Sequence, residues 1–592
     1  MHPDLSRIEV RKRPARLRFP GRVLFLVDDA ELMRRQLAGE DLAFTDEVRA
    51  KLRDQISTDE ITPAYICYYY DATLGDFPYL GLRCGGEFPV TRGSVRRGGF
   101  VCSVSGKRRG KGSSREQSPY AELMAGIRVV IAENIERIYN ENCQNLGILT
   151  STDFSLVERI RRGEEIELEA FTRDVDPITK EIIEYGGLFE FNVARLQGKV
   201  TLPPAAAQRA PVPARPMTIA EKIFARHWVV DAARGVYGVP WVRPGDSGFV
   251  LCDLRFSHEY VTPMAAIFFE EKLGPDARIT DPGSVIMFRD HLTFLHEVMP
   301  PDRVQLGLLD AARQLKAKQE EFAKKQGVVY YGERLGYRLG SEAICHSKIL
   351  ESYAEPGMLI VGTDSHTPHS GAVGCVAFGV GTTAIFNAWL TKDVRVSVPH
   401  SFKVVVRGKK PPNVTAKDFM LEILRHPYVR DGHAIGQIVE YAGEAVEALS
   451  VDERATMTNM AAEVGAFTGI VAPDARTVEF LVEQRGMERA RAEALCEGLF
   501  SDPDAEYVTV IELDAARIRP MVALPGDPGN GVAVDELGPD PVRIDVAYAG
   551  SCTAGKKEDM DMYAAVLREA LAQGLRVHPG VRLYIQCGSQ EV

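Results

Sequence analysis

The sequence predicts an α/β protein built from several parallel, doubly wound layers. Short apolar runs of strand length recur along it, among them Arg22–Val27, Val285–Phe288 and Met358–Val361. The last two lead directly into polar turns. Apolar runs that alternate with helical patterns are typical of parallel sheets, which bind ligands at the carboxyl ends of their strands.

The composition is that of an ordinary soluble chain. Its 592 residues, 45% hydrophobic and 26% charged, leave room for about three or four domains. The net charge of −11 argues against nucleic-acid binding, which usually requires a basic surface. No apolar run reaches the roughly 20 residues of a membrane span, and no secretory signal follows the basic amino terminus. Ten scattered cysteines fit a reducing compartment, so we expect a cytoplasmic protein.

The stretch 362–374, GTDSHTPHSGAVG, is the centre of the predicted site. An apolar strand comes just before it, so Asp364, Ser365 and His366 are expected at the carboxyl end of that strand. A second apolar run ends in the pair Asp290–His291. An acid beside a histidine can fix the tautomer of the ring and raise its pKa.

A third candidate is the glycine- and serine-rich block at residues 110–115, GKGSSR. Ser113 and Ser114 lie where a helix is expected to begin, and exposed amide groups there favour an anion. Arg115 adds a planar partner for a carboxylate. The basic run 107–111 is expected to be solvent-exposed, because basic stretches usually are.

Several blocks resemble the signatures of one known family, the aconitase and isopropylmalate isomerase superfamily. The most specific are GMLIVGTDSHTP at 357–368, ISTDEITPA at 56–64, KGSSREQSPY at 111–120, TNMAAEVGA at 458–466 and AGSCTAG at 549–555. The resemblance implies a small swivel domain and a multi-layer α/β body with the active site between them. It also implies a hydro-lyase or isomerase that acts on hydroxy-di- or tricarboxylates.

The resemblance further implies roles for individual residues. Ser113 would be the alkoxide-like base that takes a proton from a substrate carbon. The other catalytic candidates are Asp290, His291, His346, Asp364, His366 and Glu463. The substrate-binding candidates are Ser114, Arg115, His258, Ser365 and Asn459. Taken singly, His258 and His291 could equally be hydrogen-bonded interior histidines. Asn459 and Glu463 are four residues apart, which on one helix places them on the same face.

The family's cofactor is a [4Fe–4S] cluster with one open iron, held by three thiolates. Cys552, in the Gly-Ser-Cys block, is the one cysteine at a family ligand position, and no CxxC pair occurs in the sequence. The ligand set is therefore incomplete. We expect either that the chain stops before the family's second cysteine motif or that the protein has lost the cluster. Two further departures from the family are Gln117 in place of its histidine and Ala554 in place of its asparagine.

The motifs and composition together divide the chain. We expect an extension at 1–45, the swivel domain at 46–200 and a Pro/Ala-rich linker at 201–216. Body domains are expected at 217–400 and 401–540, with the start of a third at 541–592. A helix is expected to begin after the linker, with Thr218 as its cap.

The predicted function is that of an aconitate hydratase-like enzyme, with a small carboxylate as its partner and no membrane. DSHTP and NMAAEVGA are nearer to aconitase than to isopropylmalate isomerase signatures. An isopropylmalate isomerase-like enzyme is the alternative within the family. A cluster-free paralogue that binds a small molecule or RNA is the alternative outside it, although the acidic charge counts against RNA.

Overall fold

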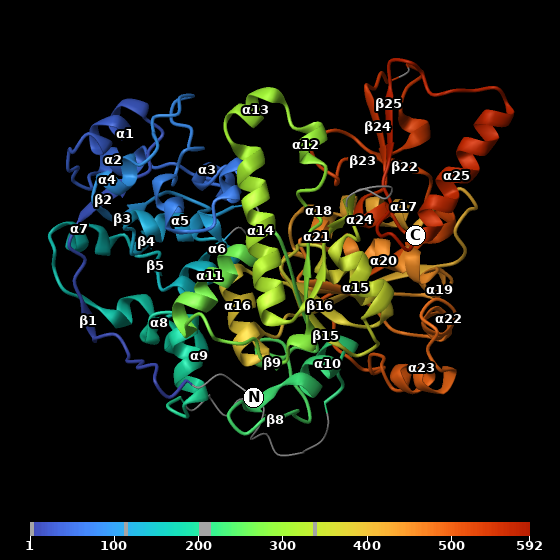
Figure 1. Cartoon of the computed structure of the whole chain (residues 1–592), viewed down its shortest axis with the longest axis horizontal. Helices are drawn as coiled ribbons and strands as arrows, with labels where there is room; N and C mark the ends of the chain where they lie inside the picture. Colours follow the sequence, from blue (N-terminus) through green and yellow to red (C-terminus); the bar gives the residue numbers. More distant parts are fainter. Residues whose placement is uncertain (1–4, 112–115, 201–214, 335–339, 541) are drawn as a thin grey trace.

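The computed structural model describes residues 5–111, 116–200, 215–334, 340–540 and 542–592. Ser113, Ser114, Arg115 and linker residues 201–214 lie outside these ranges. Four sheets of the described chain are parallel throughout, which confirms the predicted α/β class. Figure 1 shows the swivel domain (blue) on one side of the body and a small carboxyl-terminal lobe (red) on the other.

The amino-terminal part of the chain, for which the swivel domain was predicted, contains a four-stranded sheet in the order β2-β3-β4-β5. The strands are β2 (Arg22–Phe25), β3 (Phe100–Val104), β4 (Val129–Ile131) and β5 (Leu149–Ser151). Helices α5 (Gln117–Ala125) and α6 (Arg137–Leu146) connect β3 to β4 and β4 to β5. Strand β2 falls within the stretch predicted to be an extension. It is buried in the swivel core, so this sheet begins before residue 46.

The first body sheet has the order β12-β11-β10-β15-β16. Its strands are β10 (Leu254–His258), β11 (Val285–Phe288), β12 (Val329–Tyr331), β15 (Leu359–Gly362) and β16 (Val376–Gly379). A Cβ atom on Gly362 would lie 2.2 Å from the ring of Phe256 on the neighbouring strand, so a glycine is required there. Helices α11 (Thr262–Leu273), α14 (Leu308–Gln326) and α16 (Thr382–Thr391) are among those that accompany this sheet.

Helix α10 (Ile219–His227) opens the body as predicted. The Thr218 side chain accepts a hydrogen bond from the Glu221 backbone, and the Glu221 side chain accepts one from the Thr218 backbone. This reciprocal capping box satisfies amide groups that the helix itself cannot pair.

The second body sheet has the order β20-β19-β18-β21 and its own hydrophobic core. Its strands are β18 (Ser401–Arg407), β19 (Ile438–Ala442), β20 (Thr468–Val471) and β21 (Val510–Asp514). Helices α17 (Ala416–Arg425) and α20 (Val451–Asn459) pack against each other beside it. Helix α20 ends at Asn459, and the short helix α21 (Ala461–Val464) follows after Met460. The single helix expected through Asn459 and Glu463 is therefore wrong, because the chain leaves the helical path at Met460.

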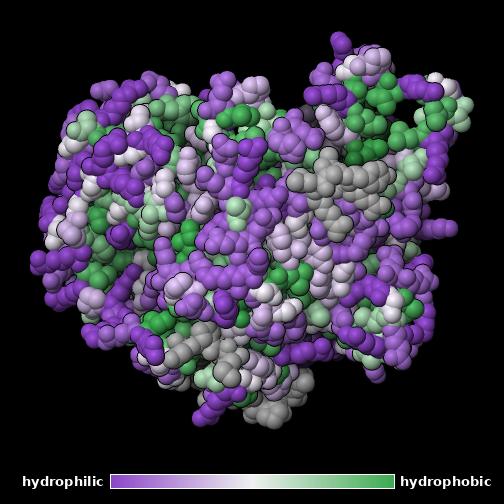
Figure 2. All heavy atoms as spheres, viewed as in Figure 1, coloured by the Kyte–Doolittle hydropathy of each residue, from purple (hydrophilic) through white to green (hydrophobic). Residues whose placement is uncertain are grey.

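The carboxyl-terminal lobe is a βαβ unit. Strand β24 (Val546–Ala549) pairs in parallel with β25 (Arg582–Ile585), and helix α25 (Lys557–Ala572) connects them. None of the residues of α25 is buried, and the apolar side chains of Tyr548, Val566 and Ile585 are exposed. Figure 2 shows this apolar surface at the upper right. Parallel sheets are normally covered on both faces, so the lobe presents surface that is usually found inside a domain.

The swivel domain is joined to the body by buried polar contacts. Arg195, on α9 (Leu188–Leu196), forms a buried ion pair with Asp393, with a shortest distance of 2.6 Å. Glu116 accepts hydrogen bonds from the backbone amide of Thr383 (2.9 Å) and from its hydroxyl, at the amino-terminal end of α16. One hydrophobic core runs through both parts. Among the described residues, no helix has the length and apolarity needed to cross a membrane.

Candidate active site

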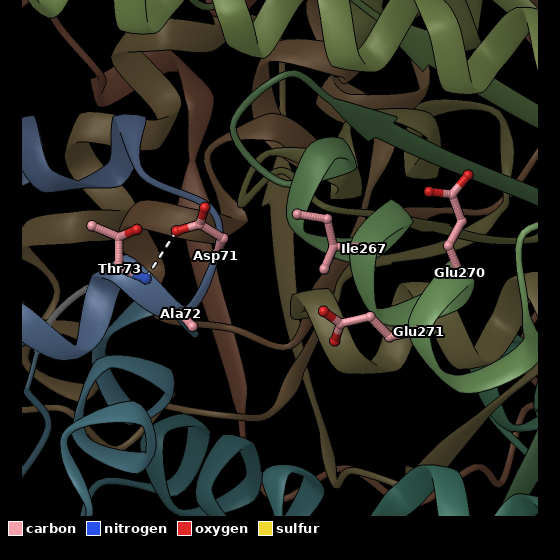
Figure 3. A pocket seen from close by; sticks show the side chains of 6 residues that line it. All are labelled: Asp71, Ala72, Thr73, Ile267, Glu270 and Glu271. Atoms are coloured by element: carbon pink, nitrogen blue, oxygen red, sulfur yellow. Dashed lines mark hydrogen bonds between the residues drawn. The ribbon is translucent and has the colours of Figure 1, made fainter.

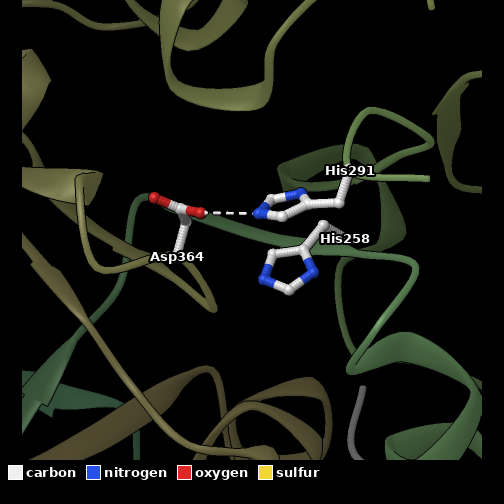
Figure 4. A group of neighbouring side chains, drawn as sticks. All are labelled: His258, His291 and Asp364. Atoms are coloured by element: carbon white, nitrogen blue, oxygen red, sulfur yellow. Dashed lines mark hydrogen bonds and ion pairs between the residues drawn. The ribbon is translucent and has the colours of Figure 1, made fainter. Parts of the chain in front are cut away.

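Three neighbouring strands of the first body sheet end in acidic and histidine side chains. His258 ends β10, Asp290 and His291 follow β11, and Asp364 follows β15. The three strands are parallel and adjacent, so their carboxyl ends bring together side chains that are about a hundred residues apart in sequence. Figure 4 shows His258, His291 and Asp364 grouped at this edge.

His291 lies between two carboxylates. Its Nδ1 is 2.8 Å from Oδ1 of Asp290, and its Nε2 is 3.1 Å from Oδ2 of Asp364. Burial lowers the pKa of the imidazole, but the two acids outweigh burial and hold its pKa well above the ordinary value. His291 is therefore a cation at neutral pH, and its side chain is 31% exposed on the side of the site.

His258 packs beneath His291 with its ring nearly parallel, at a centroid distance of 4.1 Å. Both of its ring nitrogens have backbone partners, the carbonyl of Thr363 (3.1 Å) and the amide of Tyr260 (3.3 Å). Burial and the neighbouring His291 cation lower the pKa of His258 to about 4. His258 is thus a neutral ring that supports His291.

Glu259 was not predicted as a site residue, yet it organises the loop that carries His291. It is fully buried, and it accepts hydrogen bonds from the backbone amides of Asp290 (3.2 Å), His291 (2.8 Å) and Leu292 (2.5 Å). A carboxylate that accepts several amide donors fixes the backbone around it. Its position beside the candidate His258 was the one available sequence signal.

His366 forms a second acid–imidazole pair at the same edge. Its Nε2 is 3.2 Å from Oε1 of Glu463, and its backbone amide donates to Oδ1 of Asp364 (2.7 Å). Burial lowers the pKa of His366, but the two acids raise it to about 10 overall. Ser365, next to it, is exposed, and its hydroxyl lies 3.4 Å from Nδ1 of His366.

His346 lies on α15 (Cys345–Ser352), with Nδ1 3.5 Å from Oδ1 of Asp364. Its Nε2 is buried and has no hydrogen-bond partner among the described residues. The pKa of His346 is raised, because neighbouring Cys552 and Asp364 outweigh the effect of burial.

Residues 588–591 hold the start of α15 in place. The Ile344 amide donates to the carbonyl of Gly588 (2.7 Å), and the Gln590 amide donates to the carbonyl of Glu342 (2.9 Å). The Ser589 hydroxyl donates to Glu351 on α15 (3.0 Å). The segment that follows β25 thus links the carboxyl-terminal lobe to the helix that carries His346.

Cys552, on α24 (Ser551–Ala554), faces the histidines from the carboxyl-terminal lobe. Burial raises the pKa of its thiol, but His346 and His366 outweigh burial and lower it to about 6. Its Sγ lies 3.9 Å from the amide oxygen of Asn459, which also accepts from the Thr553 hydroxyl (3.1 Å).

Asn459 connects this thiol to a histidine that was not predicted, His369. The Asn459 amide nitrogen lies 3.1 Å from Nδ1 of His369, and both residues are fully buried. Burial and the nearby His346 hold the pKa of His369 well below its ordinary value, so the ring is neutral. His369 lies in the central stretch 362–374, but the sequence contains no signal that distinguishes a histidine of the site from a histidine of the packed interior.

The described residues do not assemble the three thiolates that a [4Fe–4S] cluster requires. Cys345 is buried beside His346 (Sγ to Nδ1, 3.4 Å), and burial and the acids near it hold its pKa well above the ordinary value. Cys375 is buried and donates to the carbonyl of Glu355 (3.1 Å), and Cys587 is exposed. The pKa of Cys552, by contrast, is lowered. The donor set therefore does not fit a complete cluster.

The basic run 107–111 contains an arginine that contradicts the expected exposure. Arg109 is completely buried and forms an ion pair with Glu122, which is also completely buried. Its Nη2 also lies 2.9 Å from the hydroxyl of Tyr79. Lys107 and Lys111 are exposed as expected. The candidates Ser113, Ser114 and Arg115 lie outside the described residues.

A separate pocket of about 400 Å³ lies between η2 (Ala72–Asp76) of the swivel domain and α11. Asp71, Glu270 and Glu271 line it together with Thr73, Ala72 and Ile267 (Figure 3). Its lining contains no histidine or cysteine. The pocket therefore lacks the imidazoles that gather at the sheet edge, and the histidine cluster remains the candidate active site.

Comparisons with known proteins agree with these features. Residues 221–592 match the model of the aconitase family (aconitate hydratase), and residues 88–152 match the aconitase C-terminal domain. The chain is 37% identical over 370 residues to a 3-isopropylmalate dehydratase large subunit of Pyrococcus furiosus, covering 62% of this chain and 77% of that protein. It is 35% identical over 377 residues to the large subunit from Aquifex aeolicus, covering 64% and 78%. A solved aconitase X of Thermococcus kodakaraensis is 10% identical, and the match covers 57% of this chain and 79% of that chain with a TM-score of 0.32.

Proposed function

The chain belongs to the aconitase family and is a hydro-lyase, and from this we propose that its substrate is a hydroxy-di- or tricarboxylate that it dehydrates and rehydrates. The observation that carries the proposal is the alternation of acids and charged imidazoles at the ends of β11 and β15, beside the neutral ring of His258 at the end of β10. Removal of a hydroxyl group requires a proton donor at the leaving oxygen, and this edge holds several.

His366 is the proposed donor. With a pKa of about 10 it is protonated at neutral pH, held by Glu463 and by the Asp364 turn. Water has a pKa of about 15.7, so proton transfer from the imidazolium to a departing hydroxide is downhill. As the C–O bond breaks, the hydroxide takes this proton and leaves as water.

The complementary proton leaves the adjacent carbon. We propose that Ser113 is the base that accepts this proton, and that Arg115 and Ser114 bind a carboxylate of the substrate. In the reverse direction Ser113 returns the proton to carbon, and water returns its proton to His366 as the hydroxyl group adds. The rings of His291 and His346 supply positive charge for the hydroxyl and its neighbouring carboxylate. Asp290 and Asp364 hold these two rings in position. We propose that Ser365 completes the substrate-facing wall, and that the buried side chains of His258 and Asn459 support this wall from behind.

The motifs and the relatives point to different substrates within the family. The DSHTP motif is nearer to aconitase, whereas the relatives compared are 3-isopropylmalate dehydratase large subunits. Those relatives are named as large subunits, which implies that each of them has a small-subunit partner. In this chain we propose that the swivel domain takes that part, because residues 88–152 match the aconitase C-terminal domain.

A substrate panel tests the proposal. Hydration of cis-aconitate and of isopropylmaleate is followed by the loss of ultraviolet absorbance of the double bond. Hydration of either compound is expected from the proposal. His366→Asn should abolish hydration, whereas His296→Asn, at a half-exposed histidine paired with Glu297, should not. Equal activity of both variants would refute the assignment of His366.

A further inference from the structure

Three side chains at the histidine edge form a compact group of potential metal ligands. They are Cys345 and His346, at the start of α15, and Asp364, just after β15. All three residues are buried, and one sulfur, one nitrogen and one oxygen atom of the group lie within 4.8 Å of one another. The Asp364 side chain is 10% exposed, so solvent reaches the group from that side.

The spacing of these atoms is that of neighbouring ligands in a zinc site. Nδ1 of His346 lies 3.4 Å from Sγ of Cys345 and 3.5 Å from Oδ1 of Asp364. A ring nitrogen carries either one proton or one lone pair, so it makes only one of these two contacts as a linear hydrogen bond. Zinc bonds of about 2.0–2.3 Å at tetrahedral angles place neighbouring ligand atoms about 3.4–3.6 Å apart. One cation bound to all three atoms accounts for both distances.

The other acids and histidines at this edge are already paired. Nε2 of His291 lies 3.1 Å from Oδ2 of Asp364, which is a hydrogen-bond distance, and both ring nitrogens of His258 have backbone partners. Oδ1 of Asp364 accepts from the His366 amide (2.7 Å), and a carboxylate oxygen has a second lone pair for an ion. Oδ1 of Asp364 is therefore the carboxylate atom that faces His346 and remains available to a cation.

The chemistry of the three ligands suits a borderline-soft divalent ion. Two positive charges would be balanced by the Asp364 carboxylate and a Cys345 thiolate, since a coordinating thiol loses its proton outright. Thiolate and imidazole select zinc and similar transition metals over magnesium and calcium, which prefer oxygen ligands. The backbone amide of Cys345 donates to Oδ2 of Asp290 (2.7 Å), which fixes the start of α15 beside the sheet edge.

We propose that Cys345, His346 and Asp364 bind a divalent cation of the zinc type, and that the bound ion inhibits the enzyme. The binding site stands on its own geometry. The inhibition rests on the proposed function, in which His346 and Asp364 act on the leaving hydroxyl group and would be withdrawn by the ion. Cys552 is not a ligand of this site.

Cobalt(II) identifies the ligands directly, because a thiolate bound to it gives an intense ultraviolet charge-transfer band. The full chain, treated with a chelator, is titrated anaerobically with Co²⁺, which Zn²⁺ then displaces. The wild type and Cys552→Ser should both show the band, as should Cys375→Ser, at a buried cysteine outside the group. Cys345→Ser should lose the band and bind zinc at least about 10-fold more weakly, because even the loss of a residue that supports a ligand costs this much.

A second ligand variant keeps the test decisive if Cys345→Ser does not fold. His346→Gln should weaken zinc binding by at least about 10-fold as well. A wild type without the band would overturn the site, and so would a band that Cys552→Ser removes. Zinc affinity that neither Cys345→Ser nor His346→Gln reduces would overturn it too.

Hydration of cis-aconitate separates this inference from the proposed function. Zinc at a concentration that fills the site should lower the activity of the wild type at least about 10-fold, and a chelator should restore it. The activity of Cys345→Ser, compared with its own value without zinc, should not fall. Undiminished activity with the site filled would overturn the inhibition but not the site. A wild type that hydrates neither substrate before zinc is added would overturn the proposed function and the inhibition with it, while the cobalt titration still decides the site.

Discussion

Replacement of Glu116 by glutamine should stabilise the junction between the swivel domain and the body above neutral pH. Glu116 is buried at the amino-terminal end of α16 and accepts from the Thr383 amide and hydroxyl. Burial raises its pKa from 4.5 to about 7, although these hydrogen bonds oppose the rise. A glutamine keeps an oxygen for the Thr383 amide and can donate to its hydroxyl.

The sign and size of the effect follow from the pKa. Because the folded pKa lies above the unfolded value, the folded protein holds this proton more strongly. The contribution of Glu116 to stability is therefore greatest below about pH 4.5 and declines until about pH 7. At about 1.4 kcal/mol per pH unit, the loss amounts to about 3 kcal/mol. Glutamine has no charge to bury, so Glu116→Gln should lie within about 1 kcal/mol of the wild type at pH 5 and exceed it by about 3 kcal/mol at pH 8.

Urea unfolding at pH 5 and pH 8 measures this difference between variant and wild type. Glu506→Gln, at a side chain that is 86% exposed, is the matched control and should show no pH-dependent difference. Glu116→Ala should be less stable at both pH values by about 1–3 kcal/mol, because the Thr383 donors lose their acceptor. A Glu116→Gln variant that is as unstable as Glu116→Ala at pH 8 would show that the buried charge is needed and would refute the reasoning.

The remaining predictions concern catalysis, the cofactor and the buried ion pair. Ser113→Ala should lower turnover by about 10²–10⁴-fold with little change in substrate binding, measured by steady-state kinetics on a preparation that shows activity. Near wild-type turnover would contradict Ser113 as the base. Anaerobic reconstitution of the chain should leave no stable [4Fe–4S] absorption after gel filtration, since Cys552 is the one suitable thiolate described. A band that survives, and that Cys552→Ser removes, would show that other ligands exist. Arg109→Met should destabilise the protein by about 3–5 kcal/mol in urea, because Glu122 would be left as an unpaired buried charge. Arg109→Met combined with Glu122→Leu should recover part of that loss, and no recovery would argue against the pairing.

Local sequence patterns predicted the parts of the fold that depend on neighbouring residues. The strand β15 and its DSH turn, the end of β11 at Asp290–His291, and the capping of α10 by Thr218 all follow from short motifs. The convergence of His258, His291 and Asp364 could be expected as well. It requires only that the three strands be parallel neighbours, since the carboxyl ends of such strands share one edge.

Contacts between distant parts of the chain could not be predicted in this way. Arg109 is buried because Glu122 and Tyr79 enclose it, although its neighbours in the sequence are basic and suggested exposure. Glu259 holds the His291 loop through backbone amides, which leave no mark in the sequence. The break after Asn459 likewise depends on packing, because nothing in TNMAAEVGA itself forbids a continuous helix.

The exposed apolar faces of β24, β25 and α25 have a practical consequence for the chemistry of the thiol. A preparation of this chain should bind a hydrophobic dye, adhere to apolar resins and be cleaved first by proteases in the carboxyl-terminal lobe. Cys552 belongs to this lobe, whereas the histidines that lower its pKa belong to the rigid sheet edge and to α15. The reactivity of the thiol therefore depends on how firmly the lobe is held against the body. A polypeptide or detergent that covers the apolar surface of the lobe will therefore change the alkylation rate of Cys552, although it contacts none of the histidines or acids of the site.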